Sequence, residues 1–322
     1  MDQRKLIKLG NSSFAIALPK DWVDKSGLKK GDNIFITPNS NGELIVQPSL
    51  KKINEEKNIE INVEGKDGSA LKREISAHYV NGYNLFSIKG KRSREINEAI
   101  KKTFKDLVGV EIIKNEVDEI VAKDLLNVEE MNLSNFIRRI DNNLHEMFGV
   151  LIEGFNKKKI SQTHFSDIVE ADEDTNKFHL LISRIFSMGI DNPSILTHLK
   201  VGGLFLVNSW WFSVNLEHIG DDIKSVARII KSEPIGEKDY ENLTKLIVKL
   251  QSVYNGSLEI FYNKESNKVK TLELINEGKK LWEEFNKLTL NKNPTVAKIA
   301  MKLKESETFI YQNIKMVLNN RG

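Results

Sequence analysis

The segment that decides the N-terminal fold reads Arg4-Lys-Leu-Ile-Lys-Leu-Gly-Asn-Ser-Ser-Phe-Ala-Ile-Ala-Leu-Pro-Lys-Asp-Trp22, and Gly27-Leu-Lys-Lys-Gly-Asp32 follows it. The pattern predicts two short strands that meet at a Gly-Asn turn, then a helix that begins at Pro19-Lys20-Asp21 and ends at Gly27. A second strand pair with a turn at Asn39–Gly42 follows. Such a unit is too small to bury a core alone, so we expect it to pair with a second copy or with the rest of the chain.

Residues 4–48 resemble the AbrB/SpoVT (MazE-like) swapped-hairpin domain through the motifs G-N-S-x(5)-L-P-x-x-W and G-L-x-x-G-D. The resemblance implies an intertwined homodimer that binds DNA, with basic side chains of the first strand facing phosphates and groove edges. The candidate DNA-binding residues are Arg4, Lys5, Lys8 and Lys20. The alternative is that these charges only keep the protein in solution, because nearby acidic residues almost balance them.

The composition is that of an ordinary soluble protein: of 322 residues, 29% are charged and 40% are hydrophobic. The sequence contains no run of 18 apolar residues and no secretion-signal pattern, so we expect a cytoplasmic protein without membrane insertion. The absence of cysteine excludes disulfides, thiolate catalysis and cysteine-based zinc sites. Because the net charge is only +3, any nucleic-acid-binding face must be a local patch.

The stretch that follows reads as a polar linker, Lys51–Lys57, and a small α/β domain. Strand and helix patterns alternate in the order β-α-β-α-β-β, which is typical of a small α/β sandwich. The predicted strands are Ile59–Val63, Asn84–Ile88, Val110–Ile113 and Glu119–Ala122, and the predicted helices are Ser69–Tyr79 and Ser93–Leu107. The spaced glycines of a phosphate-binding loop are missing from this sequence.

Every segment from about residue 129 onward has a helical pattern. The predicted helices are 132–157, 161–188, 195–232, 237–263, 265–290 and 295–319. A seam of apolar residues with 4-3-4-3-4 spacing runs through Phe212, Leu216, Ile219, Ile223, Val226 and Ile230, which favours up-down bundles with short loops. Six helices in two groups of three also suggest an internal duplication.

These patterns predict a multidomain α+β protein with four parts. They are a β-rich swapped-hairpin domain for DNA binding and dimerisation (1–50), a small α/β domain (51–128), and two all-α three-helix bundles (129–235 and 236–322).

Two pairs of carboxylates lie four residues apart in the first predicted bundle: Glu170 with Asp174, and Glu217 with Asp221. Residues at this spacing share one helix face, where like charges repel unless a cation compensates them. The two helices should be antiparallel neighbours, so the four carboxylates could face one another and bind a hard or borderline cation. The alternative is a solvated acidic helix face.

The segment Leu216-Glu-His-Ile-Gly-Asp-Asp-Ile-x-x-Val-Ala227 resembles the L-E-R-I-G-D-x-x-x-N-I-A signature of PhoU, the phosphate-uptake regulator. Residues 129–322 look like its two three-helix repeats. The resemblance implies a metal site at Glu170, Asp174, Glu217 and Asp221 for a divalent or ferric ion (Fe, Zn, Mn or Mg). The second repeat has Phe309 where the family has Asp, so it should bind metal weakly at most. The whole chain resembles archaeal PhoU-type regulators, in which the motif at His78–Tyr83 lies in the middle domain.

The sequence therefore predicts a dimeric, non-enzymatic regulator of phosphate uptake or phosphate response that binds DNA and metal. Further partners implied by the resemblance are a phosphate transporter or a signalling protein. One alternative is an adaptor that docks such a partner and uses the N-terminal domain only to dimerise. A metal-dependent hydrolase is disfavoured, because the sequence shows no general base or nucleophile beside the carboxylates.

Overall fold

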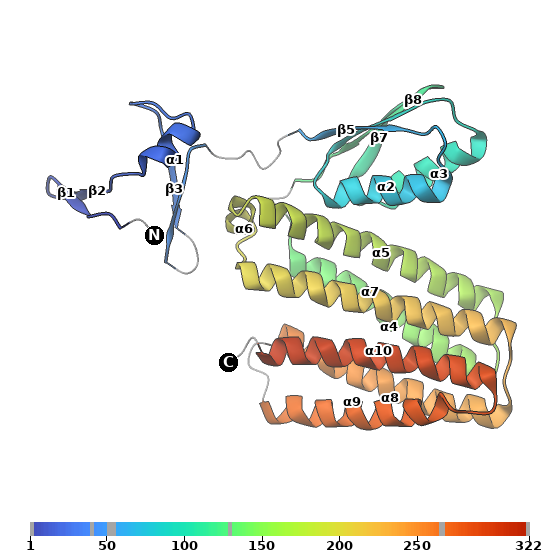
Figure 1. Cartoon of the computed structure of the whole chain (residues 1–322). Coiled ribbons are helices and arrows are strands. Elements are labelled where there is room, and N and C mark those ends of the chain that lie inside the picture. The colour runs from blue at the N-terminus through green and yellow to red at the C-terminus, as the bar shows by residue number, and fades with distance from the viewer. Residues whose placement is uncertain (1–2, 39–41, 50–55, 128–130, 264–267, 320–322) are drawn as a thin grey trace. The chain divides into compact units, whose positions relative to one another are not determined.

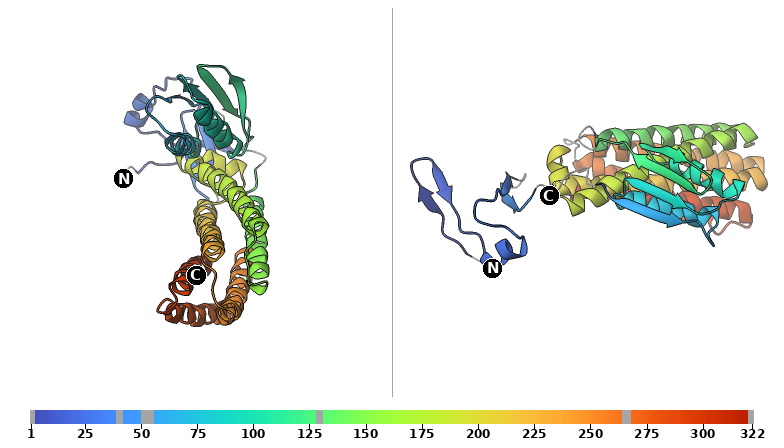
Figure 2. Two further views of the ribbon diagram at one scale, coloured as in Figure 1. Left: turned by 90° about the vertical axis from the view of Figure 1, so that its right-hand side faces the viewer. Right: turned by 90° about the horizontal axis from the view of Figure 1, so that it is seen from above.

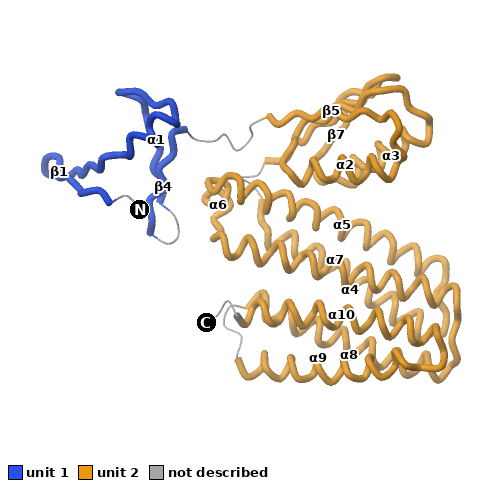
Figure 3. Tube along the Cα trace, in the orientation of Figure 1, with its two compact units in different colours: residues 1–55 blue, residues 56–322 orange. Residues whose placement is uncertain are grey.

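The structure is a computed structural model that describes residues 3–38, 42–49, 56–127, 131–263 and 268–319. Most of the predicted turn at 39–42 and of the linker at 51–57, the boundary at 128/129 and the start of the helix at 265 lie outside the described residues. The chain forms two compact units, residues 1–55 and 56–322, which Figure 3 colours separately.

The first unit is rich in strands. Strand β1 (Ile7–Leu9) pairs antiparallel with β2 (Ser13–Ala15), and β3 (Phe35–Pro38) pairs antiparallel with β4 (Leu44–Gln47). The short helix α1 (Lys20–Lys25) lies between the two hairpins in sequence. Glycine is required at the turn after β1 and at the end of α1, because Gly10 and Gly27 have φ angles of 67° and 68°. This order of elements agrees with the prediction.

The second unit begins with a four-stranded sheet in the order β5-β6-β8-β7. Its strands are β5 (Asn58–Asn62), β6 (Leu85–Lys89), β7 (Val110–Asn115) and β8 (Glu119–Asp124). Only the pair β5–β6 is parallel. Helices α2 (Gly68–Val80) and α3 (Arg94–Lys105) pack on the sheet, and each begins at an N-cap side chain, Asp67 or Ser93.

Helices make up the rest of the second unit. They are α4 (Leu133–Asn156), α5 (Gln162–Asp191), α6 (Ser194–His198), α7 (Gly203–Ser232), α8 (Glu237–Tyr262), α9 (Lys268–Leu288) and α10 (Pro294–Asn319). Helices α4, α5 and α7 pack on one another, as do α8, α9 and α10, and α7–α10 and α4–α8 contacts join the two groups (Figure 1). One continuous apolar core runs through both groups.

The predicted apolar seam of the third long helix is confirmed, because all six of its residues are buried. The prediction of a single helix over 195–232 is wrong, since the structure has a short α6 and a separate α7. The chain turns between them at Lys200, whose φ is 55°, and α7 restarts after Gly202. A residue in this left-handed conformation cannot continue an α-helix. In the described part of the chain, no helix is both long and apolar enough to span a membrane.

A buried arginine joins the α/β part to the helices. Arg184 of α5 donates hydrogen bonds to the carbonyl oxygens of Tyr79 and Tyr83, and to Asp124 Oδ2 at 2.7 Å. The Tyr79 ring lies against the guanidinium group, 4.7 Å from its central carbon. The segment His78–Tyr83, whose role the sequence left open, is therefore where the α/β part docks on α5; Figures 1 and 2 show α2 lying along that helix.

Candidate functional site

The predicted DNA-binding residues all lie on the surface of the first unit. Arg4 and Lys5 precede β1, Lys8 is the central residue of β1, and Lys20 is the first residue of α1. Side chains alternate between the two faces of a strand, so Lys8 points to the opposite face from its neighbours Ile7 and Leu9. Because Lys8 pairs with Phe14 across the hairpin, the Phe14 side chain lies on the same face as Lys8, whereas Ile7 and Leu9 lie on the other face.

The first unit leaves its apolar side chains open to solvent. The exposed fractions are 67% for Leu6, 63% for Phe14, 56% for Ile16 and 67% for Leu44. Among the side chains described for residues 3–38 and 42–49, none is buried. Isolated exposed apolar residues are ordinary on protein surfaces, but a unit with no buried side chain has no core of its own. The first unit must therefore gain its stability by packing these apolar side chains against another protein surface.

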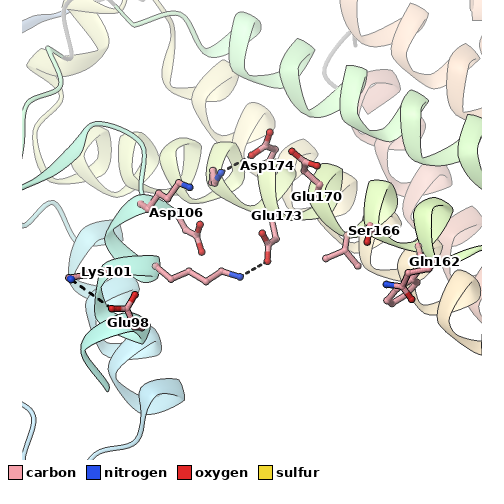
Figure 4. A pocket seen from close by; sticks show the side chains of 13 residues that line it. Glu98, Lys101, Asp106, Gln162, Ser166, Glu170, Glu173 and Asp174 are labelled. Atoms are coloured by element: carbon pink, nitrogen blue, oxygen red, sulfur yellow. Dashed lines mark hydrogen bonds and ion pairs between the residues drawn. The ribbon is translucent and has the colours of Figure 1, made fainter. Parts of the chain in front are cut away.

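The carboxylates of Glu170 and Asp174 lie on the side of α5 that faces α3. They line a cleft of about 710 Å³ between these two helices (Figure 4). Across the cleft, Lys102 of α3 pairs with Glu173 at 2.7 Å, and within α5 Lys177 pairs with Asp174 at 2.7 Å. Two of the four lysines that line the cleft are therefore paired with carboxylates of α5.

The second predicted pair lies on α7. Glu217 is mostly buried, and its pKa is raised to about 7, first by burial and then by the negative charges of Asp221 and Asp172. Asp221 is half-exposed. The two residues therefore form one acidic group on α7, as the i, i+4 spacing predicted.

The acid on α5 that faces this group is Asp172. Its side chain is 5% exposed, and burial raises its pKa although the Lys224 charge opposes the shift. The Lys224 Nζ lies 2.5 Å from Asp172 Oδ2 and 2.6 Å from Asp221 Oδ1. We name Asp172, Glu217, Asp221 and Lys224 the α5–α7 cluster. Its one basic group contacts two of its three carboxyls.

A similar group joins α7 to α10. The Lys302 Nζ lies 3.2 Å from Asp222 Oδ1 and 2.6 Å from Glu305 Oε2, and Ser306 donates a hydrogen bond to Asp222 Oδ2 at 3.1 Å. Burial raises the pKa of Asp222 to about 6, against the lowering effect of Lys302. We name Asp222, Lys302, Glu305 and Ser306 the α7–α10 cluster. Phe309, which the sequence noted in place of an acid, stacks on the ring of His218 with centroids 4.8 Å apart.

The structure does not bring the four predicted metal ligands together. Glu170 and Asp174 line the α3–α5 cleft, whereas Glu217 and Asp221 belong to the α5–α7 cluster. Across the described residues, no group of three or more His, Asp or Glu side chains is arranged to hold a metal ion. Metal binding by these four residues stays a prediction.

Sequence reasoning missed Asp172 and Lys224, although a signal for Asp172 was present. Ile168, Asp172 and Thr175 follow i, i+4, i+7 spacing, and all three are buried. A charged residue within an apolar stripe is a stronger indication of a buried polar contact than a carboxylate pair beside the stripe.

Comparison with known proteins gives one finding for this chain. Residues 7–54 match the family model described as "Antidote-toxin recognition MazE, bacterial antitoxin", which confirms the resemblance of the N-terminal segment. No curated protein and no solved structure matches the chain. The resemblance of residues 129–322 to PhoU stays a prediction.

Proposed function

We propose that the chain is a non-enzymatic, DNA-binding regulator whose first unit forms a homodimer and binds duplex DNA. The observation that carries this proposal is the match of residues 7–54 to the MazE antitoxin family. The exposed apolar side chains of the same unit support a partner copy. The exposed basic residues beside β1 support a DNA-binding face.

The expected interaction is mainly electrostatic. Arg4 and Lys8 flank or lie in β1, so a dimer would present two copies of this basic strand to the duplex. Each cation that contacts a DNA phosphate releases a counterion, which makes the affinity fall steeply with salt. A symmetric dimer also predicts two half-sites related by a two-fold axis.

The test is fluorescence anisotropy of a labelled duplex titrated with full-length protein at several salt concentrations. The Arg4→Ala/Lys8→Ala variant should bind more weakly, and the slope of log affinity against log salt should fall by about one unit per lost phosphate contact. The matched control is Lys29→Ala/Lys30→Ala, which removes two exposed cations of the same unit after α1.

The control should keep most of the wild-type slope. Equal losses in the two variants would refute a binding face at β1, because they would show only a dependence on total charge. Wild-type protein without duplex affinity at low salt would favour the adaptor, in which the first unit serves dimerisation alone.

We also propose that the helical part makes this regulator respond to phosphate. The support is the resemblance of Leu216–Ala227 to the PhoU signature. The same titration tests it: inorganic phosphate, but not sulfate at equal ionic strength, should change the duplex affinity. Equal effects of the two anions would argue against direct sensing, and a phosphate transporter or signalling protein would then have to carry the signal.

A further inference from the structure

The α5–α7 cluster already contains a cation. The Lys224 side chain is only 18% exposed, and its ammonium group contacts Asp172 on the neighbouring helix and Asp221 on its own helix. Both contacts are short, at 2.5 and 2.6 Å. Hydrogen bonds between charged partners at such distances are among the stronger ones in proteins.

The buried carboxyl of Asp172 explains why a cation is needed there. A buried charge is stable only when a partner of opposite charge and hydrogen bonds replace the lost water. Besides Lys224, the contacts of Asp172 include one long hydrogen bond of 3.4 Å from Asn176 Nδ2. Lys224 is therefore the main compensation for this carboxyl.

We propose that Lys224 is the resident cation of the α5–α7 cluster, so that a lysine ammonium group rather than a metal ion compensates Asp172 and Asp221, the second of which is one of the four metal ligands predicted from the sequence. A metal ion would have to displace this ammonium group from both carboxyls before it could coordinate them. The separate location of Glu170 and Asp174 in the α3–α5 cleft supports the same conclusion, because two of the four expected ligands face another helix.

The α7–α10 cluster repeats the arrangement and supports the proposal independently. In each cluster a lysine lies three residues from an acid on its own helix, Asp221 for Lys224 and Glu305 for Lys302. Each lysine also reaches a buried Asp on an adjacent helix of the unit. The distances to the buried Asp differ, 2.5 Å for Lys224 and 3.2 Å for Lys302, but both lysines compensate a buried acid across a helix–helix contact.

The first test measures metal directly. Full-length protein is incubated with Mn²⁺, separated from free ion by gel filtration, and assayed by elemental analysis, and its thermal midpoint is compared in Mn²⁺ and in EDTA. Wild-type protein should retain no stoichiometric metal and should melt at the same temperature in both. Stoichiometric Mn²⁺, or a midpoint that falls in EDTA, would overturn the proposal and favour the metal site.

The second test removes the lysine. Lys224→Met should lower the thermal midpoint by about 5–10 °C, because Asp172 is left without a cation. The matched control is Lys177→Met, which removes the same i, i+3 partner from the half-exposed Asp174 and should shift the midpoint by at most about 2 °C. Equal shifts in the two variants would overturn the proposal.

A third variant keeps the proposal testable if Lys224→Met does not fold. Lys224→Met combined with Asp172→Asn removes the cation together with the charge that needs it, so the double variant should melt closer to wild type than Lys224→Met does. If the double variant is no more stable than the single one, Lys224 acts through packing and the proposal fails.

Discussion

Replacement of Arg184 by methionine should destabilise the second unit more than the loss of any surface charge. The side chains of Arg184 and Asp124 are 4% and 6% exposed, and they contact each other at 2.7 Å. Methionine keeps much of the side-chain volume but leaves Asp124 buried without a cation, and the carbonyl oxygens of Tyr79 and Tyr83 each lose the hydrogen bond that Arg184 donates. Breaking a buried pair in this way costs about 3–5 kcal/mol.

The structure offers a close control for this experiment. Lys102 of α3 and Glu173 of α5 also join the α/β part to the helices at 2.7 Å, but their side chains are 61% and 42% exposed. Lys102→Met should therefore cost only about 0–1 kcal/mol, as exposed ion pairs do. Urea unfolding followed by circular dichroism measures both free-energy changes. The comparison holds when the slope of the unfolding free energy against urea concentration is the same in each variant and in the wild type.

Two further readouts separate charge from packing. Adding Asp124→Asn to Arg184→Met should recover about 1–3 kcal/mol, because the buried charge is gone. Burial already raises the pKa of Asp124, and the Arg184 charge opposes that shift. Without the arginine the folded pKa rises further above its unfolded value, so the deficit of Arg184→Met should shrink as the pH falls. If Arg184→Met lowers the unfolding free energy no more than Lys102→Met does, the buried Arg184–Asp124 pair does not stabilise the contact between the α/β part and α5.

Two more predictions concern other parts of the chain. Glu307 of α10 is 3% exposed and burial raises its pKa to about 7, so the unfolded chain loses this proton first. This group alone should lower the stability by at most about 3 kcal/mol between pH 4.5 and 7. Because the pKa values of Glu217 and Asp222 are also raised, Glu307→Gln should reduce the slope of stability against pH in urea unfolding without abolishing it, and an unchanged slope would contradict the prediction. Phe14→Asp should convert the dimer to a monomer in sedimentation experiments, whereas Val117→Asp, at a residue 84% exposed in the second unit, should not; a dimer in both variants would exclude Phe14 from the interface.

The local elements were largely predictable because their signals lie within a few residues of chain. Strand alternation and helical spacing predict β5, α2 and α3 close to their observed bounds. The exception is the break between α6 and α7, where Lys200 adopts a positive φ without a glycine at that position. Lysine rarely adopts this conformation, so residue 200 does not indicate the turn, although the Gly202-Gly203 pair just after it is a break signal.

The sequence by itself determined which residues could form each helix and that the acids of α5 and α7 are spaced four apart. Only the tertiary structure decided which acid of α5 meets α7. Asp172 is two residues from Glu170 and from Asp174, which places it about 200° around the helix from either. Burial of Ile168 and Thr175 turns the face with Asp172 inward, and Glu170 is exposed as a result. The contacts of Arg184 could not be predicted from the sequence either, because two of its acceptors are main-chain carbonyl oxygens. Every residue has such a carbonyl, so a pattern of side chains does not indicate which one accepts the hydrogen bond.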